Sequence, residues 1–294
     1  MAGEDHPCAG CLGLPMTCRL IAACCSAALL LAGAGAADAA ETQVKLDAAY
    51  TTTLLGISLG QIYWTVEVGD KRYAAVGAGA TVGLLRIFAH GHGTAKANGT
   101  VDARAVVPSD FMVSYQSGNS TDEINIAFSG GKAKETLAHP PKPDPSGVPL
   151  TDANRVGVVD PMTALLVRVP GSGDLAVPAA CERKTAVFDG KMRFDLQLAF
   201  KRIEQVRANA GYQGPAVVCA LYFSPLAGYD IGRSGVRYLK AERDMEMWLV
   251  PLAGTRLMVP FRVSVPTPLG LGVLQATRFV VTQQAEPANA MNAR

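Results

Sequence analysis

The sequence lacks a strong charge of either sign. Its 294 residues include 27 Lys and Arg against 25 Asp and Glu, a formal net charge of +2. This balance argues against a strongly basic nucleic-acid-binding protein and against a protein with a strongly acidic tail. Aromatic residues are scarce, at 6%, whereas the chain holds 30 glycines and 18 prolines. With 49% hydrophobic residues the chain is not disordered as a whole, and its composition predicts short elements joined by turns.

Long apolar runs are missing except near the N-terminus. There Arg19 precedes an apolar stretch, residues 20–35, that is shorter than the ~20 residues required by a membrane-spanning helix. Ala37 and Ala39 follow it in the Ala-x-Ala arrangement of a signal-peptidase site. We therefore predict a secretory signal peptide over residues 1–39, cleaved near Ala39.

Three alternatives to this cleavage remain open: cleavage after Ala40, an uncleaved membrane anchor, and a lipid anchor on Cys24. No later segment approaches the length of a transmembrane helix. We expect the mature chain to lie in the periplasm without spanning a membrane.

Cysteine is nearly absent from the predicted mature chain. Five of the seven cysteines lie within residues 1–39, which leaves Cys181 and Cys219. Two thiols in an exported chain, with no third thiol to compete, are expected to form a disulfide. Two buried free thiols are the alternative, and no Cys-x-x-Cys spacing indicates a redox-active pair.

The dominant pattern beyond residue 40 is alternation of apolar and polar residues in short runs, which is typical of β-strands. Asp189-Gly190 is a strong hairpin signal because both central residues of a type I′ turn need a positive φ. Asp160 and Pro161 are favoured residues for a helix N-cap and first turn, and predict one short helix over 161–168. The glycine-rich residues 91–100 are interpreted as a loop or an edge hairpin.

These patterns predict an all-β fold of about eleven to thirteen strands. We expect one strongly curved antiparallel sheet that forms a barrel-like or half-barrel shell. If side chains do not fill its apolar interior, the shell encloses a cavity.

A proline-rich segment, residues 138–150, interrupts the strand pattern. Such a segment is extended and pairs poorly as a central strand. It is either a strap across one domain or a linker between two, and we favour a strap within a single β-rich domain over 40–282. Residues 283–294 are polar and expected to be disordered.

Several short motifs occur in order along the chain. They are the run 50–60 with its GISLG turn, VVDPMTALL (158–166), Cys181-Glu182-Arg183, FDGKMRF (188–194), GYQGP (211–215) and Gly254-Thr255-Arg256. Together they resemble the bacterial envelope family known as domain of unknown function 3108, in its alphaproteobacterial branch. The resemblance implies an exported β-rich protein and supplies no catalytic residues, because the family has no assigned chemistry.

Two patterns suggest catalytic or metal chemistry only weakly. His90 and His92 would share one face of a strand and could bind a metal with Asp102 or His139, but solvated loop residues explain them better. Ser129 and Lys132 match Ser-x-x-Lys without the motifs that accompany a serine nucleophile.

Structural roles also explain the remaining candidates. Gly77, Gly79 and Gly83 depart from the dinucleotide-binding spacing and are interpreted as sites of close strand approach or bulging. Asp189 is assigned to its turn and Asp195 to the solvent face of a strand. Trp64 and Trp248 are assigned to core packing rather than ligand stacking.

A solvated sheet face accounts for the basic residues Arg183, Lys184, Lys191, Arg193, Lys201, Arg202 and Arg207, and contact with an anionic lipid or cell-wall polymer is the alternative.

The sequence thus predicts no catalytic residue, metal or cofactor. We expect a non-enzymatic cell-envelope protein of the periplasm whose β-shell binds an apolar ligand, such as a lipid or the acyl chain of a lipoprotein. The alternative is an interaction or scaffold protein that docks another envelope protein through a sheet edge or the proline-rich strap.

Overall fold

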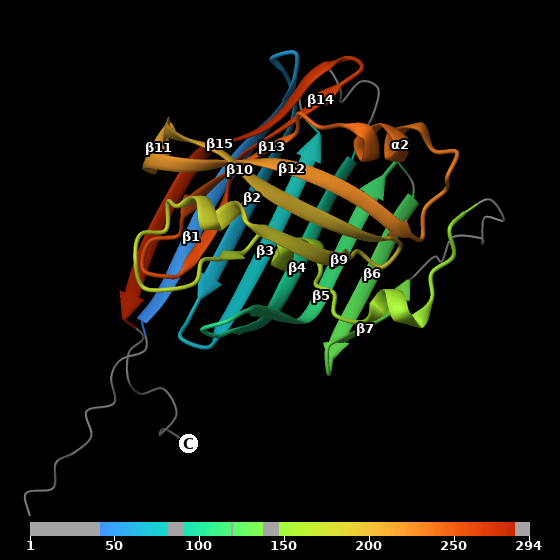
Figure 1. The fold of residues 1–294 in the computed structure, drawn as a ribbon, viewed down its shortest axis with the longest axis horizontal. Coiled ribbons are helices and arrows are strands. Elements are labelled where there is room, and N and C mark those ends of the chain that lie inside the picture. Colours follow the sequence, from blue (N-terminus) through green and yellow to red (C-terminus); the bar gives the residue numbers. More distant parts are fainter. Residues whose placement is uncertain (1–41, 82–90, 119, 138–146, 286–294) are drawn as a thin grey trace, which may run out of the picture. The chain divides into compact units, whose positions relative to one another are not determined.

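The computed structural model describes residues 42–81, 91–118, 120–137 and 147–285, which fall in one compact unit (Figure 1). The strands are β1 (Thr42–Leu54), β2 (Ile57–Val68), β3 (Arg72–Thr81), β4 (Gly91–Val101), β5 (Val106–Ser117), β6 (Ser120–Ser129), β7 (Lys132–Leu137), β8 (Val167–Arg168), β9 (Arg183–Phe188), β10 (Arg193–Arg207), β11 (Ala210–Gly211), β12 (Gln213–Ala227), β13 (Glu246–Pro251), β14 (Leu257–Thr267) and β15 (Gly270–Ala285). The helices are α1 (Pro161–Ala164), α2 (Ser234–Ala241) and the 3-10 turns η2 (Asp152–Arg155) and η3 (Pro178–Cys181).

The strands form one sheet in the order β7-β6-β5-β4-β3-β2-β1-β15-β14-β13-β12-β10-β9. Every pair along this path is antiparallel, while β11 pairs with β15 in parallel and β8 pairs with β14. The predicted all-β, barrel-like fold is therefore confirmed. In Figure 1 the sheet curls so that β9, β10 and β12 pass across β2–β7.

A short segment after η2 connects the two ends of this strand path. The Gly157 N–H donates to the Gly131 carbonyl beside β7 at 2.8 Å. Two residues later, the Val159 N–H donates to the Ala186 carbonyl of β9, and the Phe188 N–H donates to the Val159 carbonyl, both at 2.9 Å. The sheet is nearly closed because this segment bonds to both edge strands.

Hydrophobic residues fill much of the concave face of the sheet. One cluster joins Val66 of β2 and Ile126 of β6 to Phe188 of β9 and Phe261 of β14. A second cluster surrounds the two cysteines, and Leu165, which follows α1, packs against both clusters.

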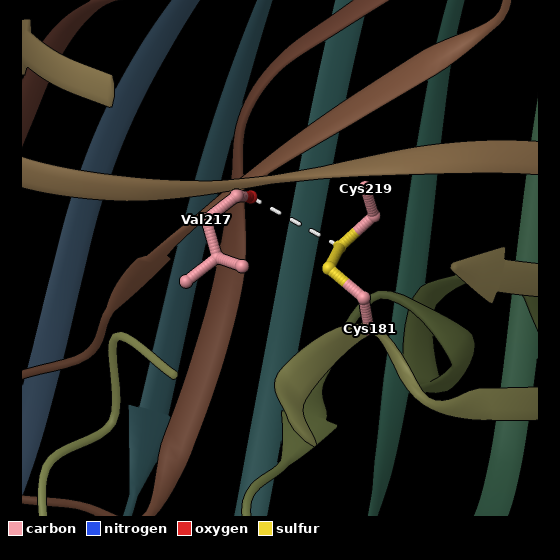
Figure 2. The surroundings of a disulfide bond; sticks show 3 residues. All are labelled: Cys181, Val217 and Cys219. Atoms are coloured by element: carbon pink, nitrogen blue, oxygen red, sulfur yellow. Dashed lines mark hydrogen bonds between the residues drawn. A yellow bond between two sulfur atoms is a disulfide. The ribbon is translucent and has the colours of Figure 1, made fainter. Parts of the chain in front are cut away.

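The disulfide expected from the sequence is present. Cys181 at the end of η3 and Cys219 on β12 are joined, with their sulfur atoms 2.01 Å apart (Figure 2). The dashed line in Figure 2 connects Cys219 Sγ to the Val217 carbonyl oxygen at 4.0 Å, which is a contact because a disulfide sulfur has no proton to donate. The bond attaches the chain that follows α1 to the central strands of the C-terminal half.

The predicted helix over 161–168 begins where expected but is shorter. Asp160 accepts hydrogen bonds from the N–H groups of Met162 and Thr163, both at 2.9 Å, which is the predicted N-cap. The helix ends at Ala164 because Val167 and Arg168 leave it to pair with β14. Their backbone bonds to a strand replace those of a last helical turn.

Two further expectations from the sequence are wrong. Residues 91–101 are strand β4, which pairs with β3 and β5 in the body of the sheet rather than at an edge. Residues 283–285 belong to β15 instead of a disordered tail, because β1 begins at Thr42 and pairs with them.

Some predicted segments fall outside the described residues: the signal peptide, residues 138–146 of the proline-rich strap and the tail from 286. The described end of the strap pairs with a loop, since the Val148 N–H donates to the Tyr229 carbonyl at 2.9 Å. No helix within the described ranges is both long and apolar enough to cross a membrane.

Candidate ligand-binding groove

The concave face of the sheet carries a patch of positions with almost no side chain. Gly77 and Gly79 of β3 face Ala95 and Gly93 of β4 in register. Because side chains alternate between the two faces of a strand, the exposed Ala78 points to the opposite, outer face. The four inward positions therefore form a floor of glycine and alanine.

Large residues border this floor on both sides. On β2, Trp64 is in register with Gly77 and Ile62 with Gly79. Val113 and Tyr115 of β5 are in register with Ala95 and Gly93. The difference in side-chain size leaves a hollow of about 290 Å³, which Met162, Leu165 and Leu274 help to line.

A second, larger hollow of about 870 Å³ lies beside the first. It is formed by β1, β2, β14, β15 and helix α2, with Leu54, Leu59, Leu239, Val263, Val265 and Leu274 among its lining residues. Since Leu274 lines both hollows, they adjoin at this residue.

A third hollow of about 400 Å³ connects the other two at the end of the sheet. It shares Leu59 with the large hollow, and Ile62 and Tyr115 with the small one. We refer to the three adjoining hollows together as the groove. Among the described residues that line the groove there is no Asp, Glu, Lys or Arg.

The opposite end of the sheet has a different chemical character. The cavities there are lined by charged residues that include Glu67, Lys71, Arg72, Asp102 and Arg256. The groove is thus an apolar region at one end of the shell.

The groove contains one buried hydrogen-bond donor without a partner. Trp64 is 6% exposed, and its indole Nε1 finds no acceptor within the described part of the chain. A Cβ atom placed on Gly77 would be 4.0 Å from Cδ1, the carbon next to Nε1, so this edge of the ring faces the floor. A buried donor left unpaired costs about 1–3 kcal/mol.

A second polar group near the groove is fully satisfied. The Tyr50 hydroxyl donates to the Pro260 carbonyl at 2.7 Å, and burial raises the pKa of Tyr50 above its ordinary value. Tyr50 therefore remains a neutral donor that holds β1 against β14.

A buried polar network attaches helix α1 to the sheet beside the groove. The Tyr73 hydroxyl of β3 is 2.5 Å from the Thr163 hydroxyl, which also bonds the Asp160 carboxylate. Burial raises the pKa of Asp160, although hydrogen bonds from Thr163 and Met162 oppose this change. The network positions Met162 in the groove.

Within the described ranges, the predicted metal ligands do not come together. His92 is exposed on β4 and borders the outer part of the groove, and His90 and His139 lie outside the described residues. Asp102 caps a turn, since its Oδ1 accepts from the N–H groups of Arg104 (2.6 Å) and Ala105 (2.8 Å). The described ranges contain no group of three metal-binding side chains.

The Ser-x-x-Lys match is a hairpin turn. Gly130 and Gly131 both adopt positive φ between β6 and β7. Ser129 is exposed, and Lys132 lies 3.9 Å from the Asp152 carboxylate. The glycine turn between two paired strands therefore accounts for the spacing of Ser129 and Lys132.

The two aspartates of the β9–β10 hairpin have different roles. Asp189 accepts from the N–H groups of Lys191 and Met192, as its turn requires, and burial raises its pKa. The assignment of Asp195 to the solvent face is wrong: its exposure is 6%, and it pairs with Lys184 at 2.8 Å and Arg193 at 2.7 Å. Burial alone would raise the pKa of Asp195, but hydrogen bonds from these two cations lower it.

Most of the predicted basic surface is neutralised by ion pairs. Lys184 and Arg193 share Asp195, Lys191 pairs with Asp122, and Lys201 and Arg202 share Glu246. These contacts agree with a solvated sheet face.

The two tryptophans occupy different environments. Trp248 lies between the guanidinium groups of Arg202 and Arg262, 5.4 and 5.2 Å from its ring centre, and donates to Glu246 at 3.0 Å. Trp64 packs in the core as predicted and also lines the groove. The sequence missed this second role because the small residues beside Trp64 become a floor only once β3 and β4 are paired.

Comparison with known proteins gives a family and similar solved structures. The model of the family "Protein of unknown function (DUF3108)" matches residues 48–277. A crystal structure of a beta-barrel-like protein of domain of unknown function DUF1849 from Brucella abortus has 11% identity and a TM-score of 0.46, over 81% of this chain and 98% of that chain. A comparison with curated protein sequences finds no match.

Proposed function

Since the chain belongs to the DUF3108 family, whose function is unknown, we propose a function from its geometry: it is a cell-envelope protein that binds an acyl chain in the groove. The ligand would be a lipid or the acyl chain of a lipoprotein. The apolar hollow of about 870 Å³ is the observation that carries this proposal.

The size and lining of the groove favour a hydrocarbon ligand. Ligand pockets in proteins commonly measure about 300–1,000 Å³ and are mostly apolar. Each methylene group that moves from water into such a site contributes about 0.8 kcal/mol. No Asp, Glu, Lys or Arg in the described lining would pair with the head group of a ligand, so the affinity would come mainly from its hydrocarbon chain.

The indole N–H of Trp64 favours a ligand with an acyl group over a plain hydrocarbon. Its buried N–H has no acceptor in the described protein, and a carbonyl oxygen of a fatty acid or ester would supply one. The ligand would then extend its chain from Trp64 along the β1 and β15 side of the groove.

The proposed location is the periplasm. The disulfide between Cys181 and Cys219 is compatible with an oxidising compartment, and the predicted signal peptide would direct the chain there. Membership of the alphaproteobacterial branch of the family stays a prediction.

We also propose that the protein is not an enzyme. The ionisable side chains that line the described groove are tyrosines and His92. One of them, Tyr238, donates to the Glu242 carboxylate at 2.9 Å at the end of α2. The groove-lining serines Ser114 and Ser234 are paired with no base in the described hydrogen bonds.

Docking of a protein through a free sheet edge has less support. Both ends of the strand path, β7 and β9, bond to the segment 156–159, which occupies part of each edge. The remainder of the proline-rich strap lies outside the described residues.

Native mass spectrometry of the chain purified from a bacterial periplasm tests the proposal. We expect a reproducible adduct that solvent extraction removes and that fragments as a lipid. Gly77→Leu should lose this adduct because the side chain fills the floor, whereas Ala78→Leu on the outer face should keep it. An apo mass for the wild-type chain, with no fatty acid bound after direct addition, would contradict the proposal.

A further inference from the structure

Two hairpin tips lie side by side at the open end of the groove. The β1–β2 hairpin turns at Leu55 and the β14–β15 hairpin at Leu269. The Leu55 N–H donates to the Leu271 carbonyl at 3.1 Å, and Leu54 is in register with Gly272. Figure 1 shows both tips and helix α2 at the same end of the sheet.

These tips present large apolar side chains to solvent. Leu55 is 67% exposed and Leu269 72% exposed, and Ile57 and Leu271 beside them are also exposed. Single exposed apolar residues are common on proteins, but a contiguous group next to a cavity marks an interaction surface.

Leu55 is also unfavourable for the backbone. Its φ is +50°, and it is the one residue other than glycine with a positive φ in the described ranges. The left-handed region favours glycine and asparagine and disfavours a branched side chain. The Leu55 side chain lies over Gly270 of the neighbouring hairpin, and most of it remains exposed to solvent. Its exposed part is available for a contact outside the isolated chain.

Helix α2 contributes positive charge at the same end. Its Tyr238 and Leu239 line the groove, while Arg233, Arg237 and Lys240 are exposed. Among the ion pairs of the described residues, none involves these three cations. Positions 233–241 contain no Asp or Glu.

We infer that this end of the molecule docks on an anionic lipid bilayer. The docking surface consists of Leu55, Ile57, Leu269 and Leu271, which would enter the interface, and Arg233, Arg237 and Lys240, which would contact lipid phosphates. An amphipathic helix with a basic polar face beside apolar anchors is the arrangement that lies on membrane surfaces. Both features are complementary to phospholipid, which offers hydrocarbon and negative charge together.

This inference goes beyond acyl-chain binding and does not require it. Docking in this orientation would place the groove opening against the bilayer, so that an acyl chain could pass between them without crossing water. Membrane binding and acyl-chain binding are nevertheless separate measurements, and either can fail alone.

Co-sedimentation of the mature chain with vesicles tests the docking surface. Vesicles of phosphatidylglycerol mixed with phosphatidylcholine should bind the chain at least about tenfold more tightly than phosphatidylcholine alone, because each basic residue adds attraction to an anionic surface. Leu55→Asn combined with Leu269→Ser should weaken binding to both vesicle types. Arg233→Gln combined with Arg237→Gln should weaken binding to the anionic vesicles and reduce its sensitivity to salt.

The matched control is Met112→Ser combined with Lys96→Gln. These residues are exposed and in register on β4 and β5, away from the tips, and their loss should leave vesicle binding unchanged. Circular dichroism would verify that each variant is folded. Absence of wild-type binding to anionic vesicles would overturn the inference, as would folded tip and helix variants that bind like the wild type. Acyl-chain binding that survives in those cases would leave the proposed function standing.

Discussion

Gly77 lies opposite Trp64 in the pairing of β2 with β3, and the space above it is open. A Cβ atom at position 77 would be 3.6 Å from the Cε of Met162 and 4.0 Å from the indole Cδ1. These are ordinary contact distances, so a small side chain would fit without moving the backbone. The glycine at position 77 therefore contributes open space to the floor of the hollow.

Gly77→Val should separate stability from binding. A β-branched residue suits a strand better than glycine, and we expect the free energy of unfolding to rise by about 0.5–1 kcal/mol. The same side chain occupies the floor of the groove and should lower fatty-acid affinity at least about tenfold, or 1.4 kcal/mol. Ala78→Val, on the exposed face of the same strand, should leave affinity unchanged. Equal affinity of both variants would show that the ligand does not use this floor.

Leu55→Asn should make the protein more stable although it removes an apolar side chain. Asparagine tolerates the left-handed conformation that Leu55 adopts, and the expected gain is about 1 kcal/mol. Leu55→Ala keeps the Cβ atom and should show no such gain. Urea unfolding at unchanged m-value measures the difference. A less stable asparagine variant would mean that Leu55 packs in the fold rather than serving an external contact.

Removal of the disulfide should be strongly destabilising. Cys181 and Cys219 are separated by 38 positions, and a closed loop of this size is worth about 4 kcal/mol in the chain-entropy model. The Cys181→Ser, Cys219→Ser double variant should therefore unfold at a much lower urea concentration, and reduction of the wild type should reproduce the shift. Peptide mapping without reductant should recover the linked pair. Free thiols at both positions in periplasmic protein would contradict the assignment.

Glu246 should make the protein sensitive to acid. Hydrogen bonds from Arg202, and then from Lys201 and Trp248, lower its pKa to about 2, although burial opposes them. Because the folded pKa lies below the ordinary value of 4.5, the carboxylate stabilises the fold at neutral pH, and this contribution disappears as the pH falls from about 5 to 2.

Glu246→Gln isolates this contribution. The variant should be less stable at pH 7 by about 1–2 kcal/mol after allowance for solvent screening, and the gap should close near pH 2. Urea unfolding across this pH range gives both curves. A gap that stays constant down to pH 2 would show that the loss comes from packing and not from the ionised carboxylate.

Local signals were sufficient where a few neighbouring residues determine the structure. Asp160-Pro161 fixed the start of α1, and Asp189-Gly190 the β9–β10 turn, because each acts through bonds to adjacent backbone groups. Helix α2 was missed because Arg233 at its N-cap makes no side-chain cap bond.

Features that depend on contacts between distant segments of the chain could not be predicted from local signals. The glycine-rich strand β4 looked like a loop, since its inward glycines and alanines have low strand propensity, but hydrogen bonds to β3 and β5 hold it in the sheet. Asp195 followed the alternation of a solvent face, yet Lys184 and Arg193 supply the charge that permits its burial. The groove likewise depends on distant strands that place small residues together.

The central claim, that an acyl chain binds beside Trp64, can be measured by fluorescence quenching. The chain has two tryptophans, so Trp248→Phe leaves Trp64 as the reporter. A fatty acid brominated along its chain should quench this emission in a saturable manner, the unbrominated acid should compete, and Gly77→Val should weaken the effect. Emission from Trp64 that is unchanged by the brominated acid, or reduced no more than that of Trp248 in a Trp64→Phe variant, would contradict the account.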